Sequence, residues 1–128
     1  MKFTELDLHG VFKIEAEPYE DERGAFRRHF CEKEFSDHGI VSNMKQSNVS
    51  ENFYSHTLRG FHYQDDPFAE GKTLSCLKGV IYDVVVDLRS DSPTYMKWIS
   101  IELSAKNRTS VHIAPGCANA FLTLEDNC

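Results

Sequence analysis

A chain of 128 residues with a formal net charge of −6 fits one domain and is too acidic to favour a nucleic-acid backbone as its partner. No apolar run is long enough to span a bilayer, and no basic stretch followed by an apolar one opens the chain, so we expect no membrane partner and no secretory leader. The four cysteines match no zinc or disulfide pattern. We therefore expect a cytoplasmic domain over residues 1–128, with free thiols.

Turn signals divide the chain into short strands in an order that can be followed from the N-terminus. Residues 21–24, Asp-Glu-Arg-Gly, predict a turn between two strands, and residues 33–38 predict a helical turn that ends at Gly39. Further strands are predicted over residues 74–77, 80–88, 98–103 and 108–113, with another beginning at Phe121. Short strands at such regular spacing predict an all-β sandwich or barrel.

The strand predicted over residues 80–88 carries two carboxylates on one face. Alternate positions place Ile81, Asp83, Val85 and Asp87 together, so acidic and apolar side chains share that face. Such a mixture is typical of the polar interior of a barrel mouth, and it is equally typical of a solvated face. Periodicity by itself leaves both interpretations open.

The densest group of chemically capable residues lies between Leu58 and Lys72. Arg59 can bind a diphosphate with two parallel hydrogen bonds, and His62 can act as a general base near neutral pH. The Lys72 ammonium can stabilise a developing enolate oxygen. Gln64 lies two positions after His62 and shares its face on a strand. Taken one at a time, Arg59 and Lys72 are better explained as surface charges and His62 as a histidine of the core.

Several motifs resemble those of the dTDP-4-dehydrorhamnose 3,5-epimerase family, in order along essentially the whole chain. The most specific is Arg-Gly-Phe-His-Tyr-Gln at 59–64 with Gly-Lys at 71–72. The others are Asp-x-Arg-Gly-x-Phe at 21–26, Tyr-Asp-Val-Val-Val-Asp-Leu-Arg at 82–89, Ser-Pro-Thr at 92–94 and Glu-Leu-Ser-Ala at 102–105.

The resemblance implies a cupin-type jelly-roll β-barrel that works as a homodimer without a metal or other cofactor. The implied substrate is a nucleotide-linked 4-keto-6-deoxyhexose, epimerised at C3 and in the family also at C5, in deoxysugar biosynthesis. The implied catalytic residues are His62 as the base, Lys72 as the enolate stabiliser and Asp83 as an inward acidic residue. The implied substrate-binding residues are Arg23, Phe26, Gln46, Asn48 and Arg59. From this sequence itself we add Arg28, Gln64 and Asn119 as candidate substrate-binding residues.

Metal-binding cupin barrels typically take ligands from a His-x-His pair, a following glutamate and a later histidine. Here Gln64 and Asn119 stand at two of the histidine positions. Amide oxygens are poor ligands for the transition metals that histidines hold. We therefore expect a barrel without a metal.

Three departures from the family pattern affect the expected chemistry. The family's catalytic tyrosine, and the acidic partner of its base, would lie beyond Cys128, so an enzyme inverting C3 alone is one hypothesis. Asn119 stands where the family often has a histidine and cannot pair with Asp83 as a charged group. Arg28 stands where the family often has a glutamate. Because cytosine offers acceptors where thymine offers N3–H, Arg28 suggests a CDP-linked sugar as well as a dTDP-linked one.

Two other functions remain open from the sequence. A cupin that binds sugar nucleotides without catalysis would share every binding residue, and a 3,4-ketoisomerase would use similar enolate chemistry. The motif around His62 favours the epimerase over the isomerase. A metal-dependent oxygenase is disfavoured by Gln64 and Asn119.

Overall fold

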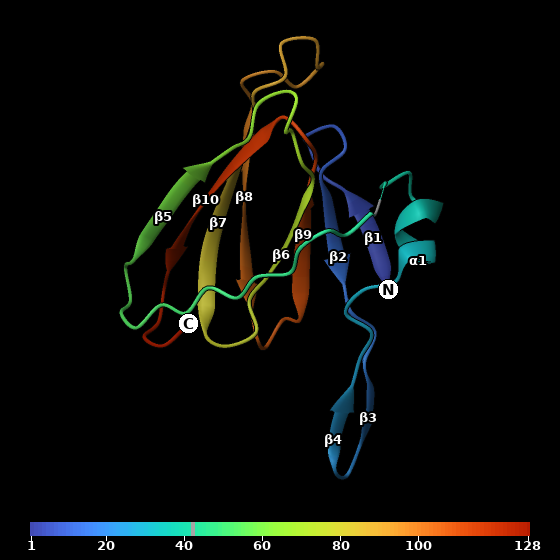
Figure 1. Ribbon diagram of the computed structural model, residues 1–128. Helices are drawn as coiled ribbons and strands as arrows, with labels where there is room; N and C mark the ends of the chain where they lie inside the picture. The colour runs from blue at the N-terminus through green and yellow to red at the C-terminus, as the bar shows by residue number, and fades with distance from the viewer. Residues whose placement is uncertain (42) are drawn as a thin grey trace.

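Strands dominate the computed structural model, which describes residues 1–41 and 43–128 (Figure 1). In these residues the strands are β1 (Lys2–Glu5), β2 (Phe12–Glu15), β3 (Tyr19–Asp21), β4 (Gly24–Phe26), β5 (Leu58–His62), β6 (Lys72–Ser75), β7 (Val80–Asp87), β8 (Trp98–Ser104), β9 (Thr109–Ile113) and β10 (Cys117–Thr123), with one helix, α1 (Glu32–Asp37). No helix in the described ranges is long and apolar enough to cross a membrane.

Two antiparallel four-stranded sheets face each other and form the body of the molecule. Their strand orders are β1-β2-β9-β6 and β5-β10-β7-β8, and the β3–β4 hairpin makes a separate two-stranded sheet. Apolar side chains from both sheets meet between them in a cluster that includes Leu8, Val11, Val85, Leu103 and Val111. The all-β prediction is therefore confirmed, because alternating side chains bury one face of each strand against the facing sheet.

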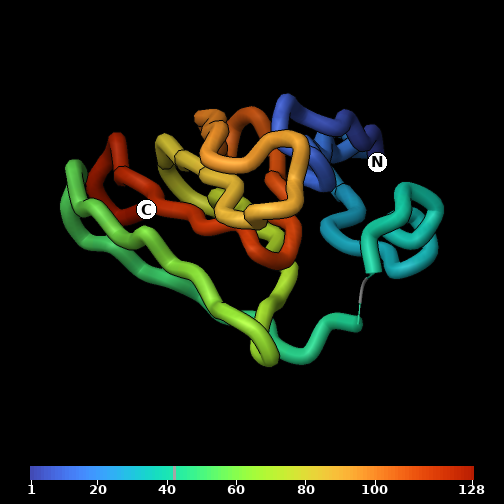
Figure 2. Tube along the Cα trace, turned by 90° about the horizontal axis from the view of Figure 1, so that it is seen from above, coloured from blue at the N-terminus to red at the C-terminus, as the bar shows by residue number. Residues whose placement is uncertain are grey.

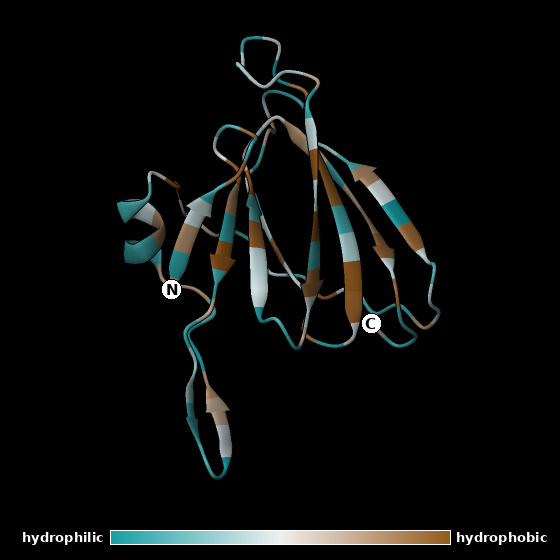
Figure 3. Cartoon of the chain, turned by 180° about the vertical axis from the view of Figure 1, so that it is seen from behind, coloured by the Kyte–Doolittle hydropathy of each residue, from teal (hydrophilic) through white to brown (hydrophobic). Residues whose placement is uncertain are grey.

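The alternation along β7 settles which face is inside. Ile81, Asp83, Val85 and Asp87 are buried, whereas the alternate positions are partly exposed or exposed. Hydrophobic and hydrophilic residues can be followed along the strands in Figure 3. The carboxylates of β7 therefore lie in the interior of the barrel and not on a solvated face.

Helix α1 covers the outer face of the β1-β2-β9-β6 sheet. Phe35 of the helix packs with Ile14 and Ile40, and its ring lies edge-on to His112 of β9 at 6.2 Å between centroids. The His112 Nδ1 atom is 3.1 Å from the Thr73 hydroxyl, and burial lowers the pKa of this histidine to about 4. The helix starts one residue earlier than the pattern predicts and ends one residue earlier, at Asp37.

Two strand predictions needed correction. Strand β6 covers Lys72–Ser75 and not 74–77, and β10 begins at Cys117, four residues before the predicted start at Phe121. The pattern over 117–120 contains an asparagine and small residues, which are weak strand signals. The strand forms there because β10 lies between β5 and β7 and pairs with both of them.

A buried carboxylate fastens the loop that follows β7. Asp87 accepts hydrogen bonds from the Arg89 guanidinium at 2.8 Å and from the hydroxyls of Ser92 and Thr94 at 2.5 and 2.6 Å. These donors hold the pKa of Asp87 well below its usual range against the opposing effect of burial. Arg89 also donates to the carbonyl oxygen of His9, so one carboxylate ties this loop to the N-terminal strands.

Replacing Asp87 with alanine should lower the free energy of unfolding by about 3–5 kcal/mol, because it leaves the largely buried Arg89 without its partner. The pKa of Asp87 is lower in the native protein than in the unfolded chain. Its contribution to stability is therefore fully present above the pKa of the unfolded chain, and it is lost as the pH falls through the pKa of the native protein. Urea unfolding followed by circular dichroism at pH 7 measures the change. The exposed neighbour Asp91, changed to alanine, is the control, and an equal loss in both variants would contradict the prediction.

Candidate active site

Three polar side chains lie side by side across the inner face of one sheet. His62 at the end of β5 is directly opposite Asn119 of β10, and the Asn119 amide donates a hydrogen bond of 3.1 Å to Asp83 Oδ1 on β7. Residues opposite each other in a sheet share a face, so His62 lies on the inner side with Asn119. The row runs from exposed His62 to fully buried Asp83.

The close approach of β5 to β10 depends on Gly60. Its φ is +116°, and a Cβ at this position would lie only 2.6 Å from the Asn119 carbonyl oxygen. The Arg-Gly-Phe-His motif therefore needs glycine at its second position, because any side chain would push β5 away from β10. This contact fixes the place of His62 two residues later.

Asp83 is the most perturbed group in the row. It has no exposed surface, its Oδ1 accepts from Asn119, and its Oδ2 has no hydrogen-bond partner among the described residues. Burial raises the pKa of Asp83 to about 7, although the hydrogen bond from Asn119 acts in the opposite direction. The carboxyl group therefore changes its charge in the neutral range.

Lys72 comes from the facing sheet. It lies at the start of β6, opposite the buried Ile113 of β9, and its Nζ is 3.9 Å from the Glu70 carboxylate. A Cβ at the preceding Gly71 would come within 3.2 Å of the His112 ring, so the chain passes close to β9 just before Lys72. The half-buried ammonium is thus placed on the opposite wall from His62.

Arg59 is held by a residue that the sequence did not indicate. Its Nε donates a 2.5 Å hydrogen bond to the side-chain oxygen of the buried Asn52. The segment that contains Asn52, Gln46 and Asn48 connects α1 to β5 along one side of the barrel (Figure 2). Gln46, Asn48 and Gln64 are all exposed and available to a ligand.

The predicted residues of the β3–β4 hairpin lie away from the interior. The hairpin projects from the two sheets (Figure 1), with Phe26 79% exposed at its end and Arg23 hydrogen-bonded to Asp21 within the turn. Arg28 forms an ion pair with Glu34 of α1, which also accepts from the amino group of Met1. The amino group and Arg28 hold the pKa of Glu34 below its usual range. One chain therefore does not bring Arg23, Phe26 and Arg28 to His62.

The described residues provide neither a metal site nor a reactive thiol beside His62, Asn119 and Asp83. In residues 1–41 and 43–128 no three histidine, cysteine or acidic side chains gather as metal ligands. Cys117 is buried in the core, where desolvation raises the pKa of its thiol to about 11. A thiol with so high a pKa is a poor proton carrier at neutral pH.

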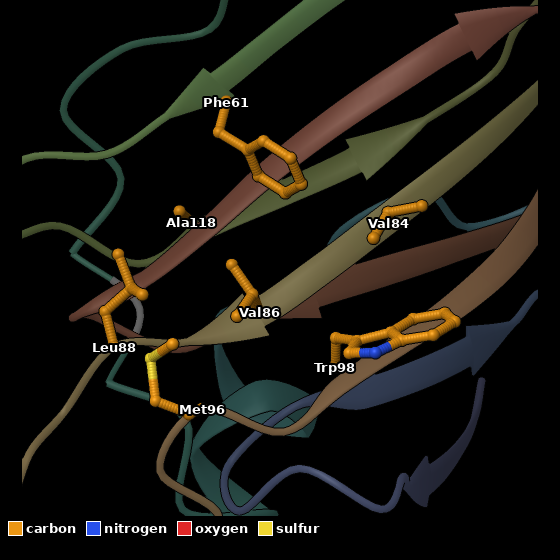
Figure 4. Close-up of a pocket in the computed structure, with 7 residues that line it drawn as sticks. All are labelled: Phe61, Val84, Val86, Leu88, Met96, Trp98 and Ala118. Carbon is orange, nitrogen blue, oxygen red and sulfur yellow. The ribbon is translucent and has the colours of Figure 1, made fainter.

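An apolar groove of about 640 Å³ lies on the outer face of the same sheet, behind the polar row (Figure 4). Its lining residues are Phe61, Val84, Val86, Leu88, Met96, Trp98 and Ala118. Because neighbours along a strand point to opposite faces, Phe61 faces this groove while His62 faces the interior. The groove contains no group that could catalyse proton transfer.

Comparison with known proteins places this arrangement in a family. The family model described as dTDP-4-dehydrorhamnose 3,5-epimerase matches residues 5–128. The chain belongs to this family. A relative from Sinorhizobium fredii (strain NBRC 101917 / NGR234), a dTDP-4-dehydrorhamnose 3,5-epimerase, is 39% identical over 98% of this chain and 64% of its own length.

Solved structures of the family share the fold. The dTDP-4-dehydrorhamnose 3,5-epimerase from Bacillus anthracis str. Ames, with TDP and PPi bound, aligns with a TM-score of 0.95 at 35% identity, over 98% of this chain and 72% of that one. ChmJ, a 3'-monoepimerase from Streptomyces bikiniensis in complex with dTDP-quinovose, aligns with a TM-score of 0.87 at 32% identity, over 96% and 62%. The cupin-type jelly-roll prediction is confirmed, and the chain spans about two thirds of the length of these relatives.

Proposed function

We propose that this protein epimerises C3 of a 4-keto-6-deoxyhexose linked to a nucleoside diphosphate, as an enzyme of deoxysugar biosynthesis. The proposal rests on one observation: His62 on β5 and Lys72 on β6 come from the two facing sheets, and both lie on the inner side of the barrel. A base on one side and a cation on the other are what enolate chemistry requires. We also place the reaction in the cytoplasm, in keeping with four free thiols.

The proposed reaction is a proton exchange with no change of oxidation state. His62 accepts the C3 proton, the C3–H electron pair moves into the C3–C4 bond, and the carbonyl electrons move onto the C4 oxygen. The Lys72 ammonium stabilises that oxyanion. When the enolate collapses, C3 takes a proton from water on the opposite face, and His62 releases the proton it accepted to solvent, so the product differs from the substrate only in configuration.

We propose dTDP as the nucleotide. The cytosine hypothesis required a guanidinium that is free to donate to a base, but Arg28 is engaged by Glu34. Arg59, whose Nε donates to Asn52, would bind the diphosphate with parallel hydrogen bonds. The dTDP and TDP complexes of the related structures agree with this choice. A competition titration in which CDP displaces a bound dTDP-sugar better than dTDP does would contradict it.

Proton NMR of dTDP-4-keto-6-deoxyglucose in D2O tests the reaction. Loss of the C3–H signal supports the epimerase, and simultaneous loss of the C5–H signal would extend the reaction to the second centre. Binding without loss of either signal would instead identify a non-catalytic sugar-nucleotide cupin. A product with its keto group at C3 would identify a 3,4-ketoisomerase.

We further propose that the protein forms a homodimer through the outer face of the β5-β10-β7-β8 sheet. Phe61, Met96 and Trp98 on this face are each about 60% exposed, and Tyr82 and Leu88 are partly exposed. Together these side chains offer on the order of 500 Å² of apolar surface, whereas each partner in a standard interface buries about 800 Å². The projecting hairpin, with its exposed Phe26, supplies further contact surface and would carry Arg23 and Phe26 towards the partner's site.

Replacing Trp98 with glutamate should convert a dimer into a monomer, because a buried carboxylate on an apolar face has no partner to compensate its desolvation. Multi-angle light scattering after gel filtration should give twice 14.7 kDa for the wild type and 14.7 kDa for the variant. Leu77, equally exposed but outside the groove, is the matched site for a control glutamate. A wild type of 14.7 kDa would refute the dimer itself.

A further inference from the structure

Asp83 is a buried carboxyl group without a cation. One of its oxygens accepts from the Asn119 amide, and the other has no hydrogen-bond partner in the described part of the chain. The strands packed on β7 place apolar side chains beside it, because Phe121 of β10 and Ile101 of β8 are the residues directly opposite. An ionised carboxylate in such a place would bear the full cost of desolvation.

The cations on the strands around Asp83 are engaged with other groups. Lys72 on the facing β6 lies beside Glu70, and Arg59 on β5 donates to Asn52. Arg89, beyond the end of β7, is bound to Asp87. Lys13 of β2 pairs with Glu15 at 3.1 Å. On the inner face of this sheet, Asp87 is bound to Arg89, Cys117 is buried opposite Asp87, and His62 lies on the far side of Asn119. Among the described residues, no cation forms an ion pair with Asp83.

Asp83 can reach the site only through a neighbouring side chain. Asp83 has no surface that could touch a sugar, so it acts through Asn119, whose amide it orients beside His62. Asp83 and His62 lie two strands apart and are offset by two residues along the strands, which together come to about 12 Å. At that distance a carboxylate still repels an enolate anion. With the effective dielectric constant of a protein interior, this repulsion slows enolate formation by a factor of about ten.

We propose that Asp83 is a positioning residue whose negative charge must be absent or compensated during catalysis, and that in the wild type its neutral carboxyl group orients Asn119 while the anionic enolate forms beside His62. This role rests on the proposed epimerase function. Loss of the Asp83 proton adds a negative charge to the interior and slows enolate formation. The enzyme therefore loses activity as the pH rises above neutrality.

The test is the pH dependence of C3 deuterium exchange from pH 5.5 to 9.5 in three proteins. Exchange by the wild type should fall about tenfold between pH 6.5 and 9, as the carboxyl group with a pKa of about 7 ionises. In Asp83→Asn, which is neutral at every pH, the decline should disappear. In Asn119→His, the imidazolium should compensate the carboxylate and move the decline to higher pH.

Carboxyl ¹³C NMR provides a readout that does not depend on activity. The Asp83 resonance, assigned by its absence from Asp83→Asn, should titrate near pH 7 in the wild type and remain ionised at pH 6 in Asn119→His. A wild-type Asp83 already ionised at pH 6 would overturn the proposal, whether or not Asn119→His folds.

The two measurements separate the possible failures. Titration near pH 7 with an unchanged alkaline decline in Asp83→Asn would overturn the role of Asp83 while leaving the epimerase function intact. A loss of exchange in Asp83→Asn that is equal at every pH would indicate only a structural role. Absence of exchange by the wild type at all pH values would overturn the proposed function, and the role of Asp83 with it.

Discussion

Replacing His62 with asparagine should abolish measurable exchange of the C3 proton, with a loss of at least about 100-fold and up to about 10,000-fold. Asparagine keeps a polar group opposite Asn119 but cannot accept a proton from carbon. Because His62 is exposed at the end of a strand, the fold should be retained. Exchange is measured by NMR in D2O with dTDP-4-keto-6-deoxyglucose, and dTDP affinity is measured by calorimetry.

His56 offers a matched control for this variant. It is an exposed histidine with φ of +61°, a backbone conformation that asparagine adopts readily, so His56→Asn should keep full exchange activity. The expected pattern is unchanged dTDP affinity in both variants and lost exchange in His62→Asn alone. Exchange at the wild-type rate in His62→Asn would exclude His62 as the base and leave the motif with a binding role.

Replacing Asp83 with asparagine should make the protein progressively more stable than the wild type as the pH rises from 4 to 8. The pKa of Asp83 is about 7 in the fold, against an ordinary value of 3.8 for the unfolded chain, so the native protein holds a proton that the unfolded chain releases between these values. The contribution of this protonated carboxyl group to the free energy of unfolding is fully present below pH 3.8 and is lost as the pH rises through 7. The loss approaches about 1.4 kcal/mol per pH unit within that window, or about 4 kcal/mol in total.

Urea denaturation at intervals from pH 4 to 8 measures this effect as the difference between wild type and Asp83→Asn. The difference in slope is diagnostic, because the cost of placing an amide at position 83 does not depend on pH. Asp91→Asn, on an exposed loop, should track the wild type. Parallel curves for the wild type and Asp83→Asn would show that the native carboxyl group titrates as it does in the unfolded chain.

The sequence predicted the strands whose signal is local. Residues 80–88 alternate apolar and polar side chains with many β-branched residues, and β7 covers almost this range. The turn at residues 21–24 was equally clear, and β3 and β4 flank it. The start of β10 was missed because Cys117–Ala120 becomes a strand only through pairing with two neighbours.

In the candidate site too, residues of a local motif were predicted, whereas their partners from distant parts of the chain were not. His62 and Lys72 belong to a short motif that resembles the family's, so the resemblance singled them out as candidates, and the fold puts them on facing sheets. The partners that orient the site come from distant parts of the chain: Asn52 for Arg59, and Glu34 for Arg28. No periodicity links such residues, and neither contact could be predicted.

By itself, the sequence determined the all-β class, the order of most strands and the identity of the residues with catalytic potential, because these depend on side-chain type and on repeats of two residues. Only the tertiary structure decided which face of β7 is buried, and with it the charge of Asp83. A carboxyl group has its ordinary pKa in water and a raised one when the facing sheet removes that water. Residues far away in the chain therefore create the environment of Asp83, because packing of the facing sheet buries its carboxyl group.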